Sequence, residues 1–214
     1  MNRQGFVFLI PAFTIFLVLF VSGVYHPRLT VLFLSMLFLL FSLFIVYFFR
    51  DPDRIIPPDN NFILSAADGK VISIKPIDAV EFIGKEGTII SVFMSVFDVH
   101  VNRIPISGKV NYIKYNKGKF LPAFEDKASL ENEQNELGLD TSKGKIVLKQ
   151  IAGIIARRIV CKVKPGDAVK AGERFGMIKF GSRVDLFLPQ GVEIKVNLNQ
   201  KVKAGETVIG VFKP

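Results

Sequence analysis

Two long apolar stretches open the chain, Phe6 to Tyr25 and Leu29 to Phe49, and neither contains Asp, Glu, Lys or Arg. Each has roughly 20 residues, the length that an α-helix needs to cross the hydrocarbon core of a bilayer. The polar triplet His26-Pro27-Arg28 separates them and breaks the helix. The pattern predicts a hairpin of two transmembrane helices over residues 1–50. A cleaved signal peptide is the alternative, but it leaves the second stretch unexplained.

The hydrophobic period changes after Asp51, where a proline-rich linker leads into short β-type runs separated by Gly, Asp and Asn. Such spacing predicts an all-β sandwich or barrel over residues 51–214 rather than alternating βαβ units. Only Leu121 to Gly138 lacks the pattern, and its polar residues predict a loop with a helical turn. The expected strands are Val71 to Ile74, Gly87 to Phe93, Lys109 to Tyr115, Lys145 to Ala152 and Arg157 to Val163.

An internal repeat lies near the C-terminus, where the string VKAGE at Val169 to Glu173 recurs at Val202 to Glu206. Each copy follows a turn and leads into a short apolar strand, which predicts two β-hairpins packed face to face. The hammerhead half-repeats of lipoyl and biotinyl domains look similar, but that likeness concerns the fold and not the chemistry. The fold expected is mainly β: a β-sandwich or barrel-sandwich-like domain behind an N-terminal two-helix transmembrane hairpin.

The net charge of +9 indicates an anionic partner, either nucleic acid or an acidic lipid surface. With a membrane hairpin predicted, we expect an anionic membrane surface and no nucleic acid. The basic part follows the second helix, which favours both termini, and the β domain, on the cytoplasmic side of the inner membrane. Cys161 is the only cysteine, which rules out an intramolecular disulfide and a four-cysteine zinc site.

Three sequence strings contain candidate catalytic residues, and each string taken alone has an ordinary structural explanation. The first is SAADGK with Asp68, where Asp-Gly is commonly just a turn. The second string, FMSVFDVHVNR, contains His100, the only histidine outside the hairpin. A single histidine is more often structural than catalytic. A metal site is not supported, because no second histidine or cysteine is available to complete a set of soft ligands. The third string is FGSRVD with Ser182, which does not match the nucleophile elbow of serine hydrolases.

Taken in order, the strings SAADGKV, FMSVFDVHVNR, KGKF, KQIAGIIARRIV and FGSRVD resemble the phosphatidylserine decarboxylase family. The similarity runs from about Phe49 to Pro214 and is closest to the short bacterial form with a hydrophobic hairpin. Archaetidylserine decarboxylases carry similar motifs, so the lipid tail of the substrate stays open between the two.

The resemblance implies a proenzyme that cuts itself between Gly181 and Ser182, giving a β chain of residues 1–181 and an α chain of residues 182–214. Ser182 becomes a covalent pyruvoyl group, the only cofactor implied. Its carbonyl forms a Schiff base with the amino group of phosphatidylserine and accepts the electrons left when carbon dioxide departs, and phosphatidylethanolamine is released. Gly181 suits the cut because it has no side chain to obstruct the attacking hydroxyl.

The resemblance also assigns roles, with one departure. His100 matches the histidine given the decarboxylation step, and Asp68 matches a base or orienting carboxylate of self-cleavage. Where longer members carry the histidine of the cleavage triad, this chain has Arg103, which stays protonated and is a poor general base. Either His100 serves both steps or cleavage is activated differently.

The headgroup of the substrate carries a phosphate and a carboxylate, which guanidinium groups pair with readily. The candidate headgroup ligands are Arg103, Arg157, Arg158 and Arg183, and Arg157 and Arg158 point to opposite faces if both lie in a strand. No metal is expected, and self-association is left open.

Two alternative functions from other classes of protein remain. A membrane-tethered hammerhead carrier module requires a modifiable lysine between the repeats; Lys179 lies there, but Gly181-Ser182-Arg183 follows it instead of a Met-Lys-Met tip. A membrane serine hydrolase using Ser182 leaves the chain uncut.

Overall fold

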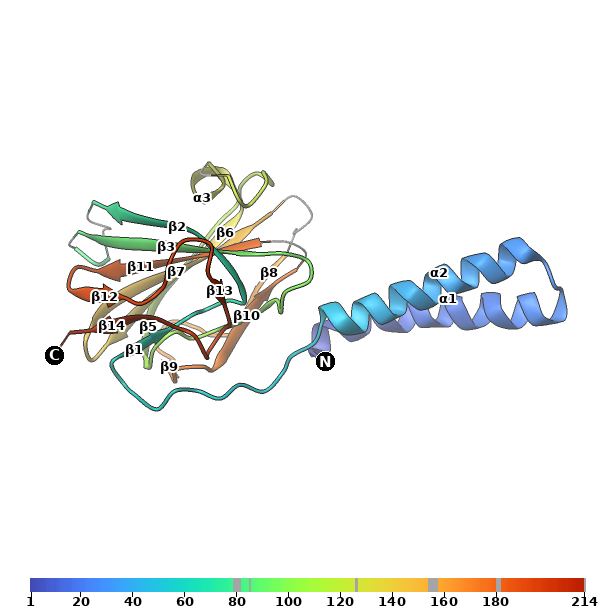
Figure 1. Ribbon diagram of the computed structural model, residues 1–214, viewed down its shortest axis with the longest axis horizontal. Coiled ribbons are helices and arrows are strands. Elements are labelled where there is room, and N and C mark those ends of the chain that lie inside the picture. The colour runs from blue at the N-terminus through green and yellow to red at the C-terminus, as the bar shows by residue number, and fades with distance from the viewer. Residues whose placement is uncertain (79–81, 85, 126, 154–157, 180–181, 214) are drawn as a thin grey trace. The chain divides into compact units, whose positions relative to one another are not determined.

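We describe the protein from a computed structural model that covers residues 1–78, 82–84, 86–125, 127–153, 158–179 and 182–213. The chain divides into two compact units, Met1–Asp53 and Arg54–Pro214. The first unit holds the two long helices, and the second holds the sheets drawn in Figure 1.

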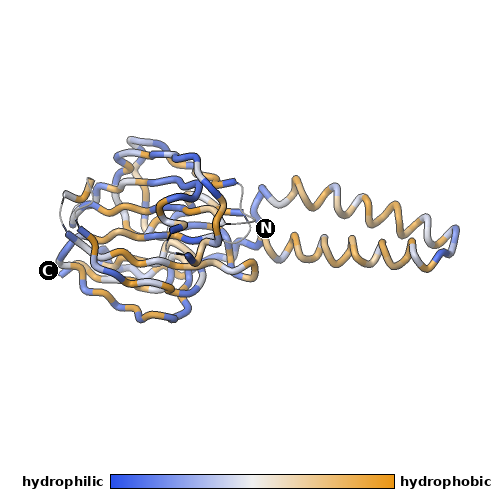
Figure 2. Tube along the Cα trace, turned by 90° about the horizontal axis from the view of Figure 1, so that it is seen from above, coloured by the Kyte–Doolittle hydropathy of each residue, from blue (hydrophilic) through white to orange (hydrophobic). Residues whose placement is uncertain are grey.

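The first unit is a helical hairpin formed by α1 (Phe6–Tyr25) and α2 (Leu29–Phe48), preceded by the 3-10 turn η1 (Arg3–Gly5). Both helices are long and apolar enough to cross a membrane. Figure 2 shows them almost uniformly hydrophobic. Side chains that point away from the partner helix, such as Phe33 and Val18, are more than 60% exposed, as a lipid-facing surface requires.

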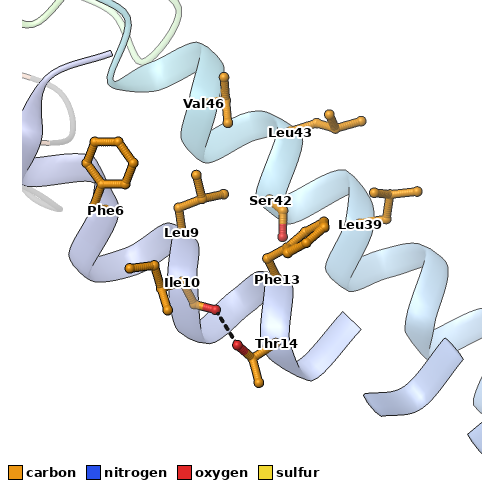
Figure 3. A pocket seen from close by; sticks show the side chains of 9 residues that line it. All are labelled: Phe6, Leu9, Ile10, Phe13, Thr14, Leu39, Ser42, Leu43 and Val46. Carbon is orange, nitrogen blue, oxygen red and sulfur yellow. Dashed lines mark hydrogen bonds between the residues drawn. The ribbon is translucent and has the colours of Figure 1, made fainter. Parts of the chain in front are cut away.

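A groove of about 380 Å³ lies between the two helices and is drawn in Figure 3. Its lining is hydrocarbon apart from two hydroxyls, and both are bonded to backbone carbonyls: Thr14 Oγ1 to Ile10 at 2.9 Å and Ser42 Oγ to Phe38 at 2.7 Å. The groove therefore offers packing for an acyl chain or a further helix but no reactive group.

The second unit is built on one large antiparallel sheet with the strand order β13-β2-β3-β11-β7-β6-β5-β9, whose strands curl across the domain in Figure 1. β11 lies near the middle of this order, paired with β3 and β7. The bounds are β2 (Gly69–Ile77), β3 (Gly87–Met94), β5 (Gly108–Asn116), β6 (Gln134–Thr141), β7 (Gly144–Ala152), β9 (Ala168–Val169), β11 (Ser182–Pro189) and β13 (Lys201–Val202).

Two small antiparallel sheets complete the unit. One has the order β4-β10-β8 and the other the order β1-β14-β12. Their bounds are β4 (Val101–Arg103), β10 (Arg174–Ile178), β8 (Ile159–Cys161), β1 (Phe62–Leu64), β14 (Val208–Phe212) and β12 (Val192–Ile194). The expected mainly β domain behind two apolar helices is confirmed.

The core lies on the concave side of the large sheet. Alternate residues of β3 and β11, including Val92, Met94, Val184 and Leu186, belong to one buried hydrophobic cluster, as the two-residue period of a strand requires. The next residues along the chain point to the other face of the sheet. This alternation decides which candidate site residues can meet.

One part of the segment Leu121 to Gly138 was wrongly expected to be irregular. The helical turn is present as α3 (Ala128–Glu131), but residues from Gln134 onward form β6. The sequence Gln-Asn-Glu lacks β propensity, and the segment is a strand because β5 and β7 pair with it on both sides.

The two copies of VKAGE lie together but are not the two hairpins expected. A Cβ on Gly205 would lie 3.5 Å from Cα of Gly172, and both glycines have a φ near +75° that favours glycine. The two strands that flank each copy do not pair with each other. Around the first copy, β9 pairs with β5, and β10 pairs with β4 and β8. Around the second copy, β13 pairs with β2, and β14 pairs with β1 and β12.

Candidate active site

Ser182 is the first residue of β11 and faces the core. Its cross-strand neighbours are Met94 on β3 and Ala152 on β7, both fully buried. Ser182 is fully buried as well, and its Oγ donates a hydrogen bond to Sδ of Met94 at 3.3 Å. Gly181, the other half of the expected cleavage site, lies outside the described residues. The serine is thus held in a buried, mainly apolar environment at one end of the central strands of the sheet.

His100 lies in the segment between β3 and β4. It immediately precedes β4, and its backbone oxygen accepts a hydrogen bond from the Ile178 amide at 3.4 Å. This bond continues the β4–β10 pairing by one residue, so the side chains of His100 and Asn102, two residues apart, leave the same side of the chain. Asn102 Nδ2 donates to Met94 Sδ at 3.7 Å, the sulfur that Ser182 also contacts. Asn102, two residues after His100, and Ser182 therefore meet at one sulfur atom.

The imidazole of His100 is fully buried and oriented by the backbone. Its Nδ1 lies 2.9 Å from the carbonyl oxygen of Asp98, and since a carbonyl only accepts, Nδ1 carries the proton. The neutral ring then has its lone pair on Nε2, the atom that can take up or deliver a proton. Asp98 itself is fixed because its carboxylate accepts from the amide and the hydroxyl of Ser95, each at 2.8 Å.

Asp68 lies just before β2 and has two strong partners. Its Oδ1 accepts from the amide of Ala204 at 2.8 Å, and its Oδ2 is 2.7 Å from Nη2 of Arg54. Burial raises the pKa of the Asp68 carboxyl above its ordinary value, and the charge of Asp98 adds to the rise. The bonds from Ala204 and Arg54 act against it by favouring the ionised form.

The position of Asp68 relative to Ser182 follows from the strand order. Lys70 on β2 pairs with Phe93 on β3, and the next residue of β3, Met94, pairs with Ser182 on β11. Asp68 thus lies at the same end of the sheet, two strands from Ser182, or about 10 Å at the usual strand spacing. The carboxylate belongs to the same site but not to the immediate surroundings of the hydroxyl.

Two of the candidate arginines, Arg103 and Arg183, bind other protein groups on the faces of their strands that point away from Ser182. Arg103 is adjacent to Asn102 in β4, so its side chain leaves the opposite face, and its Nη1 donates to the Gly172 carbonyl at 2.9 Å. Arg183 follows Ser182 in β11 and likewise points away from the core. Its Nε lies 2.5 Å from Oδ1 of Asp185, and its Nη2 donates to Ser91 at 2.8 Å.

Of the other two candidate arginines, only Arg158 can be placed, and it directly precedes β8. Arg157 lies outside the described residues. Arg158 is exposed, and its carbonyl accepts from the amide of Lys179 at 3.3 Å. Lys179 is largely buried, three residues before Ser182, and both burial and the charge of Arg158 lower its pKa. A cationic pair therefore lies beside the chain segment that leads to the serine.

Sequence reasoning missed several groups that contact the predicted ones. Met94 and Asn102 stand inside the string FMSVFDVHVNR, but nothing in the string distinguishes them from core and turn residues. Gln150, whose Nε2 donates to Asn102 Oδ1 at 2.9 Å, and Arg54 gave no signal at all. Their contacts join strands that are distant in the sequence.

Comparison with known proteins gives one consistent result. Residues 41–210 match the family described as phosphatidylserine decarboxylase. A protein of Geobacter metallireducens named phosphatidylserine decarboxylase proenzyme is 47% identical over 210 residues, covering 98% of this chain and 95% of that protein. A protein of the same name from Chlorobium phaeobacteroides is 49% identical, covering 79% of this chain and 80% of that protein. Another from a Wolbachia species is 45% identical, covering 97% of this chain and 89% of that protein.

Proposed function

Because this chain belongs to the phosphatidylserine decarboxylase family, we propose that it is a self-cleaving proenzyme that decarboxylates phosphatidylserine to phosphatidylethanolamine. The observation that carries the proposal is the match of family and site. The serine of the FGSRVD string is fully buried at the start of a central strand, and it contacts the same Met94 sulfur as Asn102, two residues after the histidine of the family's motif.

Self-cleavage begins at the Ser182 hydroxyl. Its oxygen attacks the Gly181 carbonyl carbon, the amide C–N bond breaks, and the amino group of Ser182 is freed as an ester forms. Loss of the Cα proton then breaks the Cβ–O bond and releases residues 1–181 with a C-terminal carboxylate. The resulting enamine tautomerises to an imine, and water replaces its nitrogen with oxygen, releasing ammonia. The product is a pyruvoyl group at the start of residues 182–214.

The surroundings of Ser182 suit that group. The pyruvoyl methyl replaces a hydroxymethyl group whose neighbours, Met94 and Ala152, are apolar and fully buried. The pyruvoyl carbonyl supplies an electron sink for the carbon that loses carbon dioxide.

His100 is the group we assign to proton transfer in the decarboxylation. Its Nδ1 proton is held by the Asp98 carbonyl, so Nε2 is the atom that would first take up a proton from solvent and then donate it to the carbon that carbon dioxide has left. Asp68 is assigned to self-cleavage as an ionised, oriented carboxylate two strands from Ser182. Arg103 is not assigned to proton transfer, because its guanidinium remains protonated and is bonded to Gly172.

The headgroup is assigned to the cationic end of the small sheet. Arg158 is exposed there and Lys179 lies beside it, whereas Arg183 is paired with Asp185. Arg157 remains a candidate by its place in the sequence. The hairpin anchors the enzyme in the inner membrane with the β domain on the cytoplasmic side, and the net charge of +9 favours docking on an anionic leaflet.

Intact mass spectrometry under denaturing conditions tests the proposal, with Ser182→Ala as the matched control. We expect two fragments that divide between Gly181 and Ser182, the smaller one blocked by pyruvoyl, and an uncut Ser182→Ala chain. An uncut wild-type chain that still decarboxylates lipid removes the pyruvoyl mechanism. Extraction of lipids from the source cells separates phosphatidylserine from an archaeal-type lipid as substrate.

A further inference from the structure

Three buried amide side chains form a continuous line of hydrogen bonds that ends at the Ser182 contact. Asn135 Nδ2 donates to Gln150 Oε1 at 3.0 Å, and Gln150 Nε2 donates to Asn102 Oδ1 at 2.9 Å. Asn102 Nδ2 donates to Met94 Sδ at 3.7 Å, the atom that also accepts the Ser182 hydroxyl at 3.3 Å. Each of the three amides is at most 3% exposed.

This amide line crosses from one sheet to another. Asn135 and Gln150 are paired residues of β6 and β7 in the large sheet, whereas Asn102 belongs to β4 in a small sheet. The crossing needs a close approach at Gly176 of β10, where a Cβ would lie 2.9 Å from Gln150 Nε2. The missing side chain leaves room for the glutamine to reach the other sheet.

The polarity of the line fixes each amide in one orientation. Because Asn102 Oδ1 accepts from Gln150, its Nδ2 must point towards Met94, and because Gln150 Oε1 accepts from Asn135, its Nε2 must point towards Asn102. Turning any one amide over puts two donors or two acceptors face to face. Apolar side chains of similar volume would give a core of equal stability. The role of the buried hydrogen-bonded line is therefore to fix the relative positions of the strands rather than to stabilise the fold.

We propose that Asn102, Gln150 and Asn135 are positioning residues that hold β4, which His100 immediately precedes, in register with the strands that carry Met94 and Ser182. The proposal rests on the proposed function, in which Ser182 and His100 are the reacting groups. Met94 touches the reacting oxygen itself. A thioether is a weak acceptor and takes no proton at neutral pH, so it orients the hydroxyl without competing with the base.

The first test compares Gln150→Leu with Gln134→Leu. Gln134 is a buried glutamine on β6 whose Oε1 accepts no hydrogen bond in the described part of the chain, which makes it a matched control. We expect Gln150→Leu to slow self-cleavage by about tenfold or more and to lower kcat of the cleaved enzyme with little change in KM. Gln134→Leu keeps both rates. Equal rates in wild type and Gln150→Leu overturn the proposal.

Gln150→Glu adds a readout that a purely space-filling role does not move. An ionised glutamate cannot donate to Asn102 Oδ1, so the Asn102 amide turns its Nδ2 away from Met94. The variant loses self-cleavage at high pH and recovers it as the introduced carboxyl is protonated, a dependence that wild type lacks. A pH profile identical to that of wild type contradicts the proposal.

If Gln150→Leu does not fold, Met94→Leu with Met177→Leu as control decides the question, because both methionines are buried and, of the two, it is Met94 whose sulfur accepts the Ser182 hydroxyl. Slower cleavage in Met94→Leu alone supports the proposal, and equal rates in both overturn it. Failure of the proposed function has a different signature: the wild-type chain itself stays uncut.

Discussion

Arg54 Nη2 lies 2.7 Å from Asp68 Oδ2, with both side chains largely buried. The same guanidinium reaches Glu206 Oε2 at 3.4 Å. Arg54 is the first residue of the β unit, directly after the segment that ends the hairpin unit. The contact ties the beginning of this unit to the carboxylate assigned to self-cleavage.

Arg54→Gln is expected to shift the pH dependence of self-cleavage. Arg54 lowers the pKa of Asp68 against the effect of burial, so its removal raises that pKa further. The rate, which requires the ionised carboxylate, then falls away at a higher pH on the acid side. The measurement is the cleavage rate from intact mass across a pH series.

Arg54→Gln is also expected to lower the folding stability, because protonation of Asp68 is linked to folding. A folded-state pKa above the unfolded value means that ionising Asp68 costs stability as the pH rises. Losing Arg54 increases this cost, by about 3 kcal/mol at neutral pH for a broken buried pair. Glu206→Gln, which leaves the Asp68 contact intact, is the control. An unchanged profile in Arg54→Gln would show that the pair does not tune Asp68.

His100→Ala is expected to lower decarboxylation by about a hundredfold or more, because proton delivery by a positioned side chain is lost. The measurement is release of carbon dioxide from phosphatidylserine in mixed micelles, divided by the fraction of cleaved chains from intact mass. Normalising in this way separates the two roles open to His100. Full activity per cleaved chain contradicts its assignment to the decarboxylation.

Asp185→Asn is expected to destabilise the fold by about 3 kcal/mol, since it leaves the buried Arg183 charge without its partner. The double variant Arg183→Met with Asp185→Leu recovers most of the loss, because no buried charge remains. Thermal unfolding in detergent, followed by far-ultraviolet circular dichroism, measures both. A raised KM in a folded double variant would instead assign Arg183 to the headgroup.

Gly69→Ala is expected to displace Asp68. Gly69 has a φ of +152°, and an added Cβ would lie 2.1 Å from the Phe93 carbonyl oxygen, so the start of β2 must move. The cost is about 2 kcal/mol or more, with slower self-cleavage. Gly166→Ala is the control, because Gly166 has a φ of +96° and open space around its Cβ. Equal effects in the two variants would show that the contact with Phe93 does not matter.

Parts of the fold could be read from local pattern. The helices α1 and α2 end within one residue of their expected bounds, because twenty apolar residues without a charge are unambiguous. The strands β3 and β7 were likewise expected within a residue or two. The strand β6 was missed because Gln134, Asn135 and Glu136 have no β pattern, and only pairing with β5 and β7 makes them a strand.

The sequence by itself determined the family and the order of the candidate strings, and it proposed Ser182, His100 and Asp68 as site residues because they match the family's motifs in type and spacing. Only the tertiary structure decided which of them meet. Side chains alternate along a strand, so Ser182 contacts the same Met94 sulfur as Asn102 while its neighbour Arg183 is turned to the opposite face and pairs with Asp185. Partners such as Arg54 and Gln150 come from distant strands, and their hydrogen bonds exist only once the sheets have packed.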